Sequence, residues 1–202
     1  MQVMKYPSKN NFTNENSILF FENKDSFSWN VIDALPFPRA DIEIILPGSN
    51  YLPGENEDSV KAVILGPGPM DPLRTGMIDL VRFYAGQKIP VLGICLGFQA
   101  IGMAFGAKLI QTNPVHGKRS SIAFSPSRYF PDFTGMVEVM RYHSLSLSEV
   151  KSPLRVIAST SEGIPMAIEH ETLPIAGLQF HPDSFATQRG IELIQSFFDK
   201  AV

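Results

Sequence analysis

Short apolar runs alternate with longer amphipathic segments through the first half of the chain. The runs span residues 18–21, 42–46, 62–65 and 91–94. Each run ends at a turn signal, and runs of this length predict buried strands of a parallel sheet. Apolar residues at helical spacing predict helices over residues 27–35, 73–84 and 98–105. This alternation predicts a doubly wound, mostly parallel α/β sheet with helices on both faces.

After Gly106 the pattern becomes strand-rich, with few helical stretches. Strand-like segments cover residues 122–124, 136–142, 154–158 and 166–168. They predict a smaller antiparallel addition in the C-terminal half. Residues 174–180 predict one more strand, and residues 190–198 predict a closing amphipathic helix. The inner side of that helix is expected to carry Ile191, Ile194, Phe197 and Phe198.

The length and composition favour one folded domain. The chain has 202 residues, 44% of them hydrophobic and 18% charged. Residues 1–16 are polar and Asn-rich without apolar periodicity, so they predict a flexible leader before a single domain over residues 17–202. The net charge of −3 provides no basic surface for nucleic acid or anionic lipid. No apolar run is long enough to span a membrane, and a single cysteine fits a reducing cytoplasm.

The first candidate for chemistry is Cys95. It follows the predicted strand 91–94, has Gly93 and Gly97 on either side, and precedes a predicted helix. A strand, nucleophile and helix in this order form an elbow that projects the side chain at the carboxyl edge of the sheet. The helix N-terminus stabilises a thiolate, and the backbone N–H of Leu96 is placed to stabilise an oxyanion. A lone cysteine in an apolar run is also typical of a buried core residue.

A base for this thiol stands at the end of another predicted strand. His181 is followed two residues later by Asp183, an acid that can orient the imidazole and stabilise its cation. A surface histidine before a proline turn is the structural alternative. The Gly and Pro residues of segment 66–72 predict a rigid turn whose exposed N–H groups suit the other half of an oxyanion hole.

Together these segments resemble the class I, triad-type glutamine amidotransferases. In that family a G-x-C-x-G-H-Q elbow, an F-H-P-E segment and a Pro-Gly-Pro turn form the glutaminase site. More specifically, the stretch from Ile18 to the C-terminus resembles the small subunit of anthranilate synthase and aminodeoxychorismate synthase. The matching segments are Phe21 to Asn30, against the subgroup's D-N-x-D-S-F-T-x-N, His116 to Lys118 and Arg141 to Leu145.

The resemblance implies roles for individual residues. Cys95 corresponds to the nucleophile, His181 to the base, and Asp183 to the acid that orients it. Gly68 and Leu96 correspond to the backbone donors of the oxyanion hole. The expected glutamine-binding set comprises Gly68, Pro69, Met70, Gln99, Ser144 and Leu145.

Three positions depart from the family pattern. Asp183 stands where Glu is usual, so the contact to His181 must be made with a side chain one methylene shorter. Phe98 replaces the His of G-H-Q, outside the triad, and is expected to change packing rather than chemistry. Met70 stands where Gly is usual and is expected to narrow the loop over the substrate.

Other conspicuous residues are expected to be structural. Trp29 is predicted to lie in the core and His170 on the surface. His143 either lines the glutamine pocket or packs and caps. The polar cluster His116, Lys118 and Arg119 is either a solvated turn or, by the resemblance, a face near a partner subunit. Cys95 and His181 lack further ligands at zinc-binding spacing, so no metal site is expected.

The resemblance implies a glutaminase subunit that supplies ammonia to a larger chorismate-using synthase subunit. The product of that partner would be anthranilate or 4-amino-4-deoxychorismate. No cofactor is implied for this chain, and magnesium is expected only in the partner. Two alternatives stay open: a non-catalytic subunit of the same complex, motivated by Met70, Phe98 and Asp183, and a γ-glutamyl amidase or peptidase that acts without a partner.

Overall fold

A computed structural model describes residues 17–49, 51–54 and 59–202 of the chain. The predicted leader, residues 1–16, lies outside the described residues. The elements in chain order, with η marking short 3-10 helices, are β1 (Ser17–Phe21), α1 (Ser28–Ala34), η1 (Arg39–Asp41), β2 (Ile42–Ile45), β3 (Val60–Leu65), η3 (Pro72–Arg74), α2 (Met77–Gln87), β4 (Val91–Ile94), α3 (Leu96–Ala104), β5 (Lys108–Phe124), β6 (Gly135–Ser148), β7 (Leu154–Ser159), β8 (Pro165–His170), β9 (Ile175–Leu178) and α4 (Gly190–Ala201).

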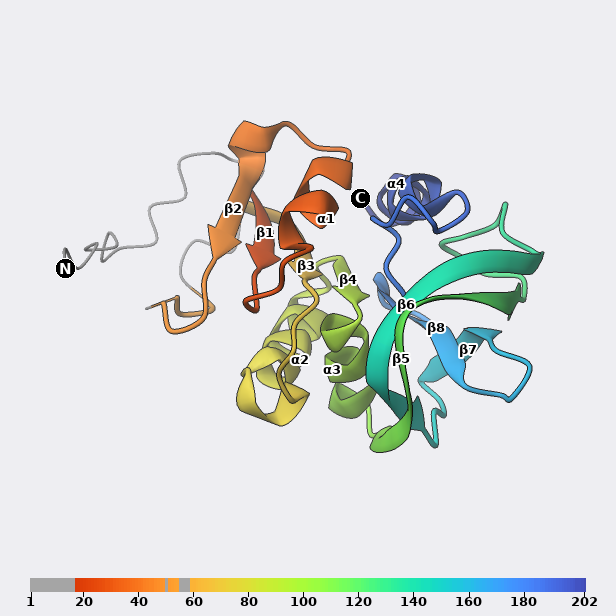
Figure 1. The fold of residues 1–202 in the computed structure, drawn as a ribbon. Helices are drawn as coiled ribbons and strands as arrows, with labels where there is room; N and C mark the ends of the chain where they lie inside the picture. Colours follow the sequence, from red (N-terminus) through yellow and green to blue (C-terminus); the bar gives the residue numbers. More distant parts are fainter. Residues whose placement is uncertain (1–16, 50, 55–58) are drawn as a thin grey trace.

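The predicted parallel half is confirmed. Strands β2, β1, β3, β4 and β9 lie side by side in this order and run parallel. Helices α1 and α4 cover one face of this half, and α2 and α3 cover the other (Figure 1). All carboxyl ends of these strands therefore meet at one edge, where ligands of open α/β sheets bind.

The antiparallel addition is also confirmed, and it continues the same sheet. Among the described residues the sheet has nine strands, with β8, β7, β5 and β6 following β9. Strands β5 and β6 form a long ribbon of 17 and 14 residues (Figure 1). The predicted strands 122–124 and 136–142 are only parts of it, because much of β5 is solvent-exposed and polar and its strand geometry comes from pairing with β6. His116, Lys118 and Arg119 therefore lie on an exposed strand rather than in a turn.

The helix predicted over residues 73–84 begins later than expected. Residues Pro72–Arg74 form a 3-10 turn, and α2 starts at Met77. Gly76 between them has φ 75°. This left-handed conformation interrupts a right-handed helix and is one that glycine adopts at little cost.

Two expectations about helix faces are wrong. Trp29 is 58% exposed, with the Arg39 guanidinium 5.5 Å from its ring centre, and Ile191 is 53% exposed. The buried face of α1 carries Ser28, Val31 and Ile32. In each helix the buried residues recur every three or four positions, and Trp29 and Ile191 stand one position beyond that stripe. The buried face of α4 carries Gly190, Leu193, Ile194, Phe197 and Phe198.

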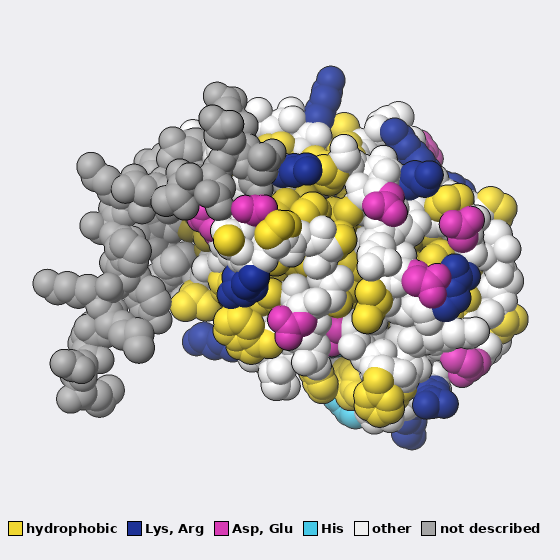
Figure 2. Space-filling view, turned by 90° about the horizontal axis from the view of Figure 1, so that it is seen from above, with side chains coloured by type: hydrophobic (Ala, Val, Ile, Leu, Met, Phe, Trp, Pro, Cys, Tyr) yellow, Lys and Arg dark blue, Asp and Glu magenta, His cyan; other side chains and the backbone are white. Residues whose placement is uncertain are grey.

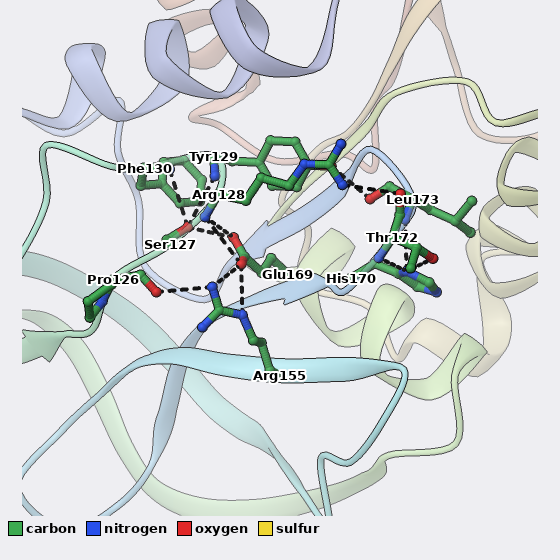
Figure 3. Close-up of polar contacts among 10 residues, drawn as sticks. All are labelled: Pro126, Ser127, Arg128, Tyr129, Phe130, Arg155, Glu169, His170, Thr172 and Leu173. Atoms are coloured by element: carbon green, nitrogen blue, oxygen red, sulfur yellow. Dashed lines mark hydrogen bonds and ion pairs between the residues drawn. The ribbon is translucent and has the colours of Figure 1, made fainter.

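A buried carboxylate joins strands β7 and β8 to the loop after β5 (Figure 3). Glu169 of β8 is 2% exposed and forms an ion pair with Arg155 of β7. It also accepts hydrogen bonds from the Ser127 hydroxyl and from the backbone N–H of Arg128. Its charge is therefore compensated by one cation and two neutral donors, as burial of a carboxylate requires.

The expectation that His170 lies on the surface is wrong. It is 5% exposed, and Nδ1 accepts hydrogen bonds from the N–H groups of Thr172 and Leu173. Its ring packs against Phe105 at 4.8 Å between centres. Burial lowers the pKa of His170. The flanking acids Glu169 and Glu171 suggest a solvated segment, but β8 is an internal strand of the sheet.

One face of the molecule carries side chains of both charges. Figure 2 shows Lys and Arg side chains interspersed with Asp and Glu over one face of the molecule. In the described part of the chain, no helix is long and apolar enough to cross a membrane.

Candidate active site

Cys95 lies in the turn between β4 and α3, as the elbow pattern predicts. Its backbone has φ 52° and ψ −97°, a strained conformation for a residue other than glycine. The turn is held by a hydrogen bond from the Cys95 N–H to the Leu178 carbonyl of β9, at 2.8 Å. The thiol is thus presented at the carboxyl edge of the parallel strands, at the N-terminus of α3.

The two glycines around Cys95 are required by packing. A Cβ atom at Gly97 would lie 2.1 Å from the carbonyl oxygen of Leu65, at the end of β3. One at Gly93 would lie 2.5 Å from the carbonyl oxygen of Gly97. Helix α3 therefore approaches the strand ends more closely than any side chain permits.

His181 and Asp183 follow β9 and are buried. The backbone N–H of His181 donates to the Met140 carbonyl of β6 at 3.1 Å. The Thr187 hydroxyl donates to the backbone carbonyl of His181 at 2.6 Å. Nδ1 of His181 lies 3.3 Å from Oδ1 of Asp183, and the Asp183 side chain has no solvent-exposed surface. Despite its shorter side chain, Asp183 lies within ion-pair distance of the imidazole, without the alignment of a hydrogen bond.

The electrostatics favour a positively charged His181. Burial lowers the pKa of the imidazole, but the nearby Asp183 and Cys95 side chains outweigh burial and raise it from 6.5 to about 10. Neither carboxylate oxygen of Asp183 has a hydrogen-bond donor among the described residues, so the imidazolium is its charge partner. The rings of Phe27 and Tyr142 stand edge-on to His181 at 5.4 and 5.2 Å. The pair is thus an ion pair sheltered from water.

Gly68 packs against the side chain of Leu96. A Cβ atom at Gly68 would be 2.8 Å from a methyl carbon of Leu96 and 2.6 Å from Cβ of Asn23. Asn23 shapes this loop, because its Nδ2 donates to the Phe21 carbonyl at 3.1 Å and to the Gly66 carbonyl at 3.3 Å. The backbone of Gly68 therefore lies next to the residue that follows the thiol.

Met70 lies elsewhere on the same loop. It lines a cavity of about 660 Å³ at the ends of β1 and β2, together with Asn23, Tyr51, Arg74 and Phe83. Cys95 and His181 do not line this cavity. Pro69 is exposed. Gly68, from the same loop, packs against Leu96 of the elbow.

The Gln99 side chain and the Leu145 main chain form another part of the site, called the Gln99 arm below. Nε2 of Gln99 donates to the Leu145 carbonyl at 3.2 Å, and Nδ1 of His143 lies 2.9 Å from the same oxygen. The Arg141 Nε donates to His143 Nε2 at 3.0 Å, which places the histidine proton on Nδ1. Burial and the Arg141 charge lower the pKa of His143 to about 4. His143 therefore packs as a neutral donor that helps to orient the Ser144–Leu145 main chain.

One residue that contacts the thiol, Gln179, is absent from the set predicted from the sequence. Its Nε2 lies 3.7 Å from Sγ of Cys95, and its Oε1 accepts from Gln99 Nε2 at 3.2 Å. The signal that could have found it is its position, two residues before His181 at the end of β9.

Phe98, the departure from G-H-Q, is fully buried and packs against Gly177 of β9. Phe98 therefore contributes to packing, as expected.

The described residues contain no group of three or more His, Cys, Asp or Glu side chains arranged to hold a metal ion. The arrangement offers a thiol near a positively charged imidazole, a glycine loop packed against the residue that follows the thiol, and the side-chain amides of Gln99 and Gln179. These are the parts needed for attack on a carbonyl carbon.

Comparison with known proteins agrees with this geometry. The chain is 39% identical over 189 residues to anthranilate synthase component 2 of Lactococcus lactis, covering 91% of this chain and 94% of that protein. It is 34% identical to aminodeoxychorismate/anthranilate synthase component 2 of Bacillus subtilis, covering 90% and 95%. The bifunctional protein TrpGD of Thermotoga maritima is 32% identical, and the chain spans 32% of its length.

Among solved structures, a glutamine amidotransferase from Thermotoga maritima has the same fold. It superimposes with a TM-score of 0.68 at 17% identity, covering 92% of this chain and 84% of that one. Residues 19–201 match the family described as glutamine amidotransferase class-I. Because this match includes the elbow, the His181 segment and the sheet that joins them, the chain belongs to the class-I glutamine amidotransferase family.

Proposed function

We propose that this chain is a glutaminase subunit that hydrolyses L-glutamine at Cys95 and delivers the ammonia to a chorismate-binding synthase subunit. The observation that carries the proposal is the buried His181–Asp183 pair, which also interacts with a strained cysteine at a helix N-terminus. The relatives named component 2 favour a synthase that makes anthranilate, 4-amino-4-deoxychorismate or both.

The proposed reaction has two halves. The Cys95 thiolate attacks the amide carbon of glutamine and forms a C–S bond, while the N–H groups of Gly68 and Leu96 stabilise the negative oxygen. His181 gives its proton to the leaving nitrogen, so ammonia departs and a γ-glutamyl thioester remains. Water then attacks the thioester, His181 takes its proton, and the C–S bond breaks to release glutamate and regenerate the thiolate.

The substrate and partner complete the proposal. Gln99 and the Ser144–Leu145 main chain would hold the glutamine, with the Pro69 and Met70 loop at the rim. The chain itself would need no cofactor, and magnesium would belong to the chorismate-binding partner. The single cysteine supports a cytoplasmic protein.

The test is synthesis by the complex reconstituted with each candidate synthase subunit, using either glutamine or ammonium as nitrogen source. We expect Cys95→Ala to abolish glutamine-dependent synthesis and to leave ammonium-dependent synthesis intact. Equal loss of both would overturn the proposal. Absence of a γ-glutamyl adduct on Cys95 would indicate a non-catalytic subunit, whereas full activity of the isolated chain on glutamine would indicate an independent amidase.

A further inference from the structure

Gln179 connects the nucleophile to the Gln99 arm of the site. It directly follows Leu178, whose carbonyl holds the Cys95 N–H, and its side chain is completely buried. Its two amide ends have different partners. Nε2 lies 3.7 Å from Sγ of Cys95, and Oε1 accepts from Nε2 of Gln99 at 3.2 Å.

A backbone carbonyl fixes the orientation of the side-chain amides of Gln99 and Gln179. The Leu145 oxygen can only accept, so Gln99 must turn its NH₂ group toward it. The same NH₂ group meets Gln179, which must therefore present its carbonyl oxygen there. The remaining end of Gln179 is the NH₂ group, and it faces the sulfur. A flipped Gln179 would oppose two NH₂ groups and turn an oxygen lone pair toward Sγ.

An N–H donor next to sulfur stabilises the thiolate more than the thiol. A hydrogen bond to a charged acceptor is stronger than one to a neutral acceptor. We propose that Gln179 is a positioning residue for Cys95: its carboxamide donates to the thiolate and fixes Sγ relative to Gln99. The description of Cys95 as the nucleophile rests on the proposed function, whereas the effect of Gln179 on the thiolate does not.

The test uses the whole chain without partner or glutamine. Because Cys95 is the single cysteine, alkylation by iodoacetamide and the thiolate absorbance at 240 nm both report on this residue alone. Both are followed from pH 5 to 9 in the unsubstituted chain, Gln179→Met and Gln179→Glu. Gln188→Met, which makes the same change at an exposed glutamine, is the matched control.

We expect Gln179→Met to lower the alkylation rate constant at pH 7 by about tenfold, the equivalent of about 1.4 kcal/mol, and to move the rise of both signals to higher pH. Gln179→Glu keeps the shape of the side chain but turns a carboxylate toward sulfur, so it should lower the alkylation rate constant further. Gln188→Met should have the same alkylation rate constant and pH profile as the unsubstituted chain. In the reconstituted complex, Gln179→Met should lower kcat for glutamine while KM stays within about twofold.

Profiles of folded Gln179→Met or Gln179→Glu that superimpose on that of the unsubstituted chain would overturn the inference. If Gln179→Met fails to fold, the isosteric Gln179→Glu decides the question. A Cys95 that stays unreactive and without thiolate absorbance throughout this pH range in the unsubstituted chain would also overturn it. Normal Gln179-dependent profiles without glutamine turnover in any complex would overturn the proposed function alone.

Discussion

Nδ1 of His181 lies 3.3 Å from Oδ1 of Asp183, only two residues further along the chain. The contact is made within a turn that Thr187 and β6 hold in place, so the histidine and its acid form one local unit. The turn brings the shorter acid within ion-pair distance of the imidazole. The distance between His181 and Cys95 in the sequence is instead bridged by the pairing of β4 with β9.

Asp183→Asn should lower kcat/KM for glutamine by roughly 10²–10⁴, because the neutral amide no longer stabilises the imidazolium or its tautomer. Asp183→Glu keeps the charge and is the matched control, expected to stay much closer to the unsubstituted chain. Steady-state ammonia release by the complex measures both. An Asn variant within twofold of the original rate would contradict the assigned role of Asp183.

Gly97→Ala should destabilise the chain by about 1–3 kcal/mol or more, because the new Cβ would lie 2.1 Å from the Leu65 carbonyl and α3 must move. The control is Gly86→Ala in α2, where a Cβ meets nothing within 4 Å. That change should stabilise the chain by about 0.5–1 kcal/mol. Urea unfolding midpoints give both values, and equal midpoints for the two variants would refute the close approach at the elbow.

Glu169→Gln should lower the free energy of unfolding by about 2 kcal/mol, since it removes the charge shared by Arg155, Ser127 and Arg128. Glu192→Gln is the control, because the Arg189–Glu192 pair lies on the surface. Its effect should stay below about 0.5 kcal/mol. Thermal and chemical unfolding of both variants measure the difference. A Glu169 variant as stable as the Glu192 variant would show that the buried pair adds nothing.

His143 should make stability depend on pH between about 4 and 6.5. Burial and Arg141 lower its pKa to about 4 in the folded chain, whereas the unfolded chain titrates near 6.5. Between these pH values the unfolded state holds the extra proton. The contribution of His143 to the free energy of unfolding is therefore fully present above pH 6.5 and is lost as the pH drops toward 4. The full loss would be about 3 kcal/mol.

Unfolding of the unsubstituted chain and of His143→Gln between pH 4 and 8 isolates this contribution, because all other groups titrate in both. The stability advantage of the unsubstituted chain should shrink as the pH falls below 6.5. Parallel curves would mean that His143 is not held neutral by burial.

Local patterns predict most of the parallel half and the turn that carries Cys95. Apolar runs mark β1, β3 and β4 because a buried strand needs apolar residues on both faces, and the glycines around Cys95 mark the elbow because no other residue fits. The expectations for Trp29 and His170 are wrong because burial depends on which neighbours an element acquires. The full length of the β5–β6 ribbon escapes prediction for the same reason, since its exposed residues form strands only through pairing.

The sequence by itself therefore specifies the reactive residue types, the turns that carry them and the resemblance to a family. These depend on local chemistry: a cysteine between glycines, a histidine followed by an acid, and apolar runs of strand length. Only the tertiary structure decides that Gln179 faces the thiol, that His143 is neutral, and that Met70 lines a cavity at the ends of β1 and β2. Those properties depend on contacts between residues far apart in the chain and on burial, which arise only when the sheet assembles.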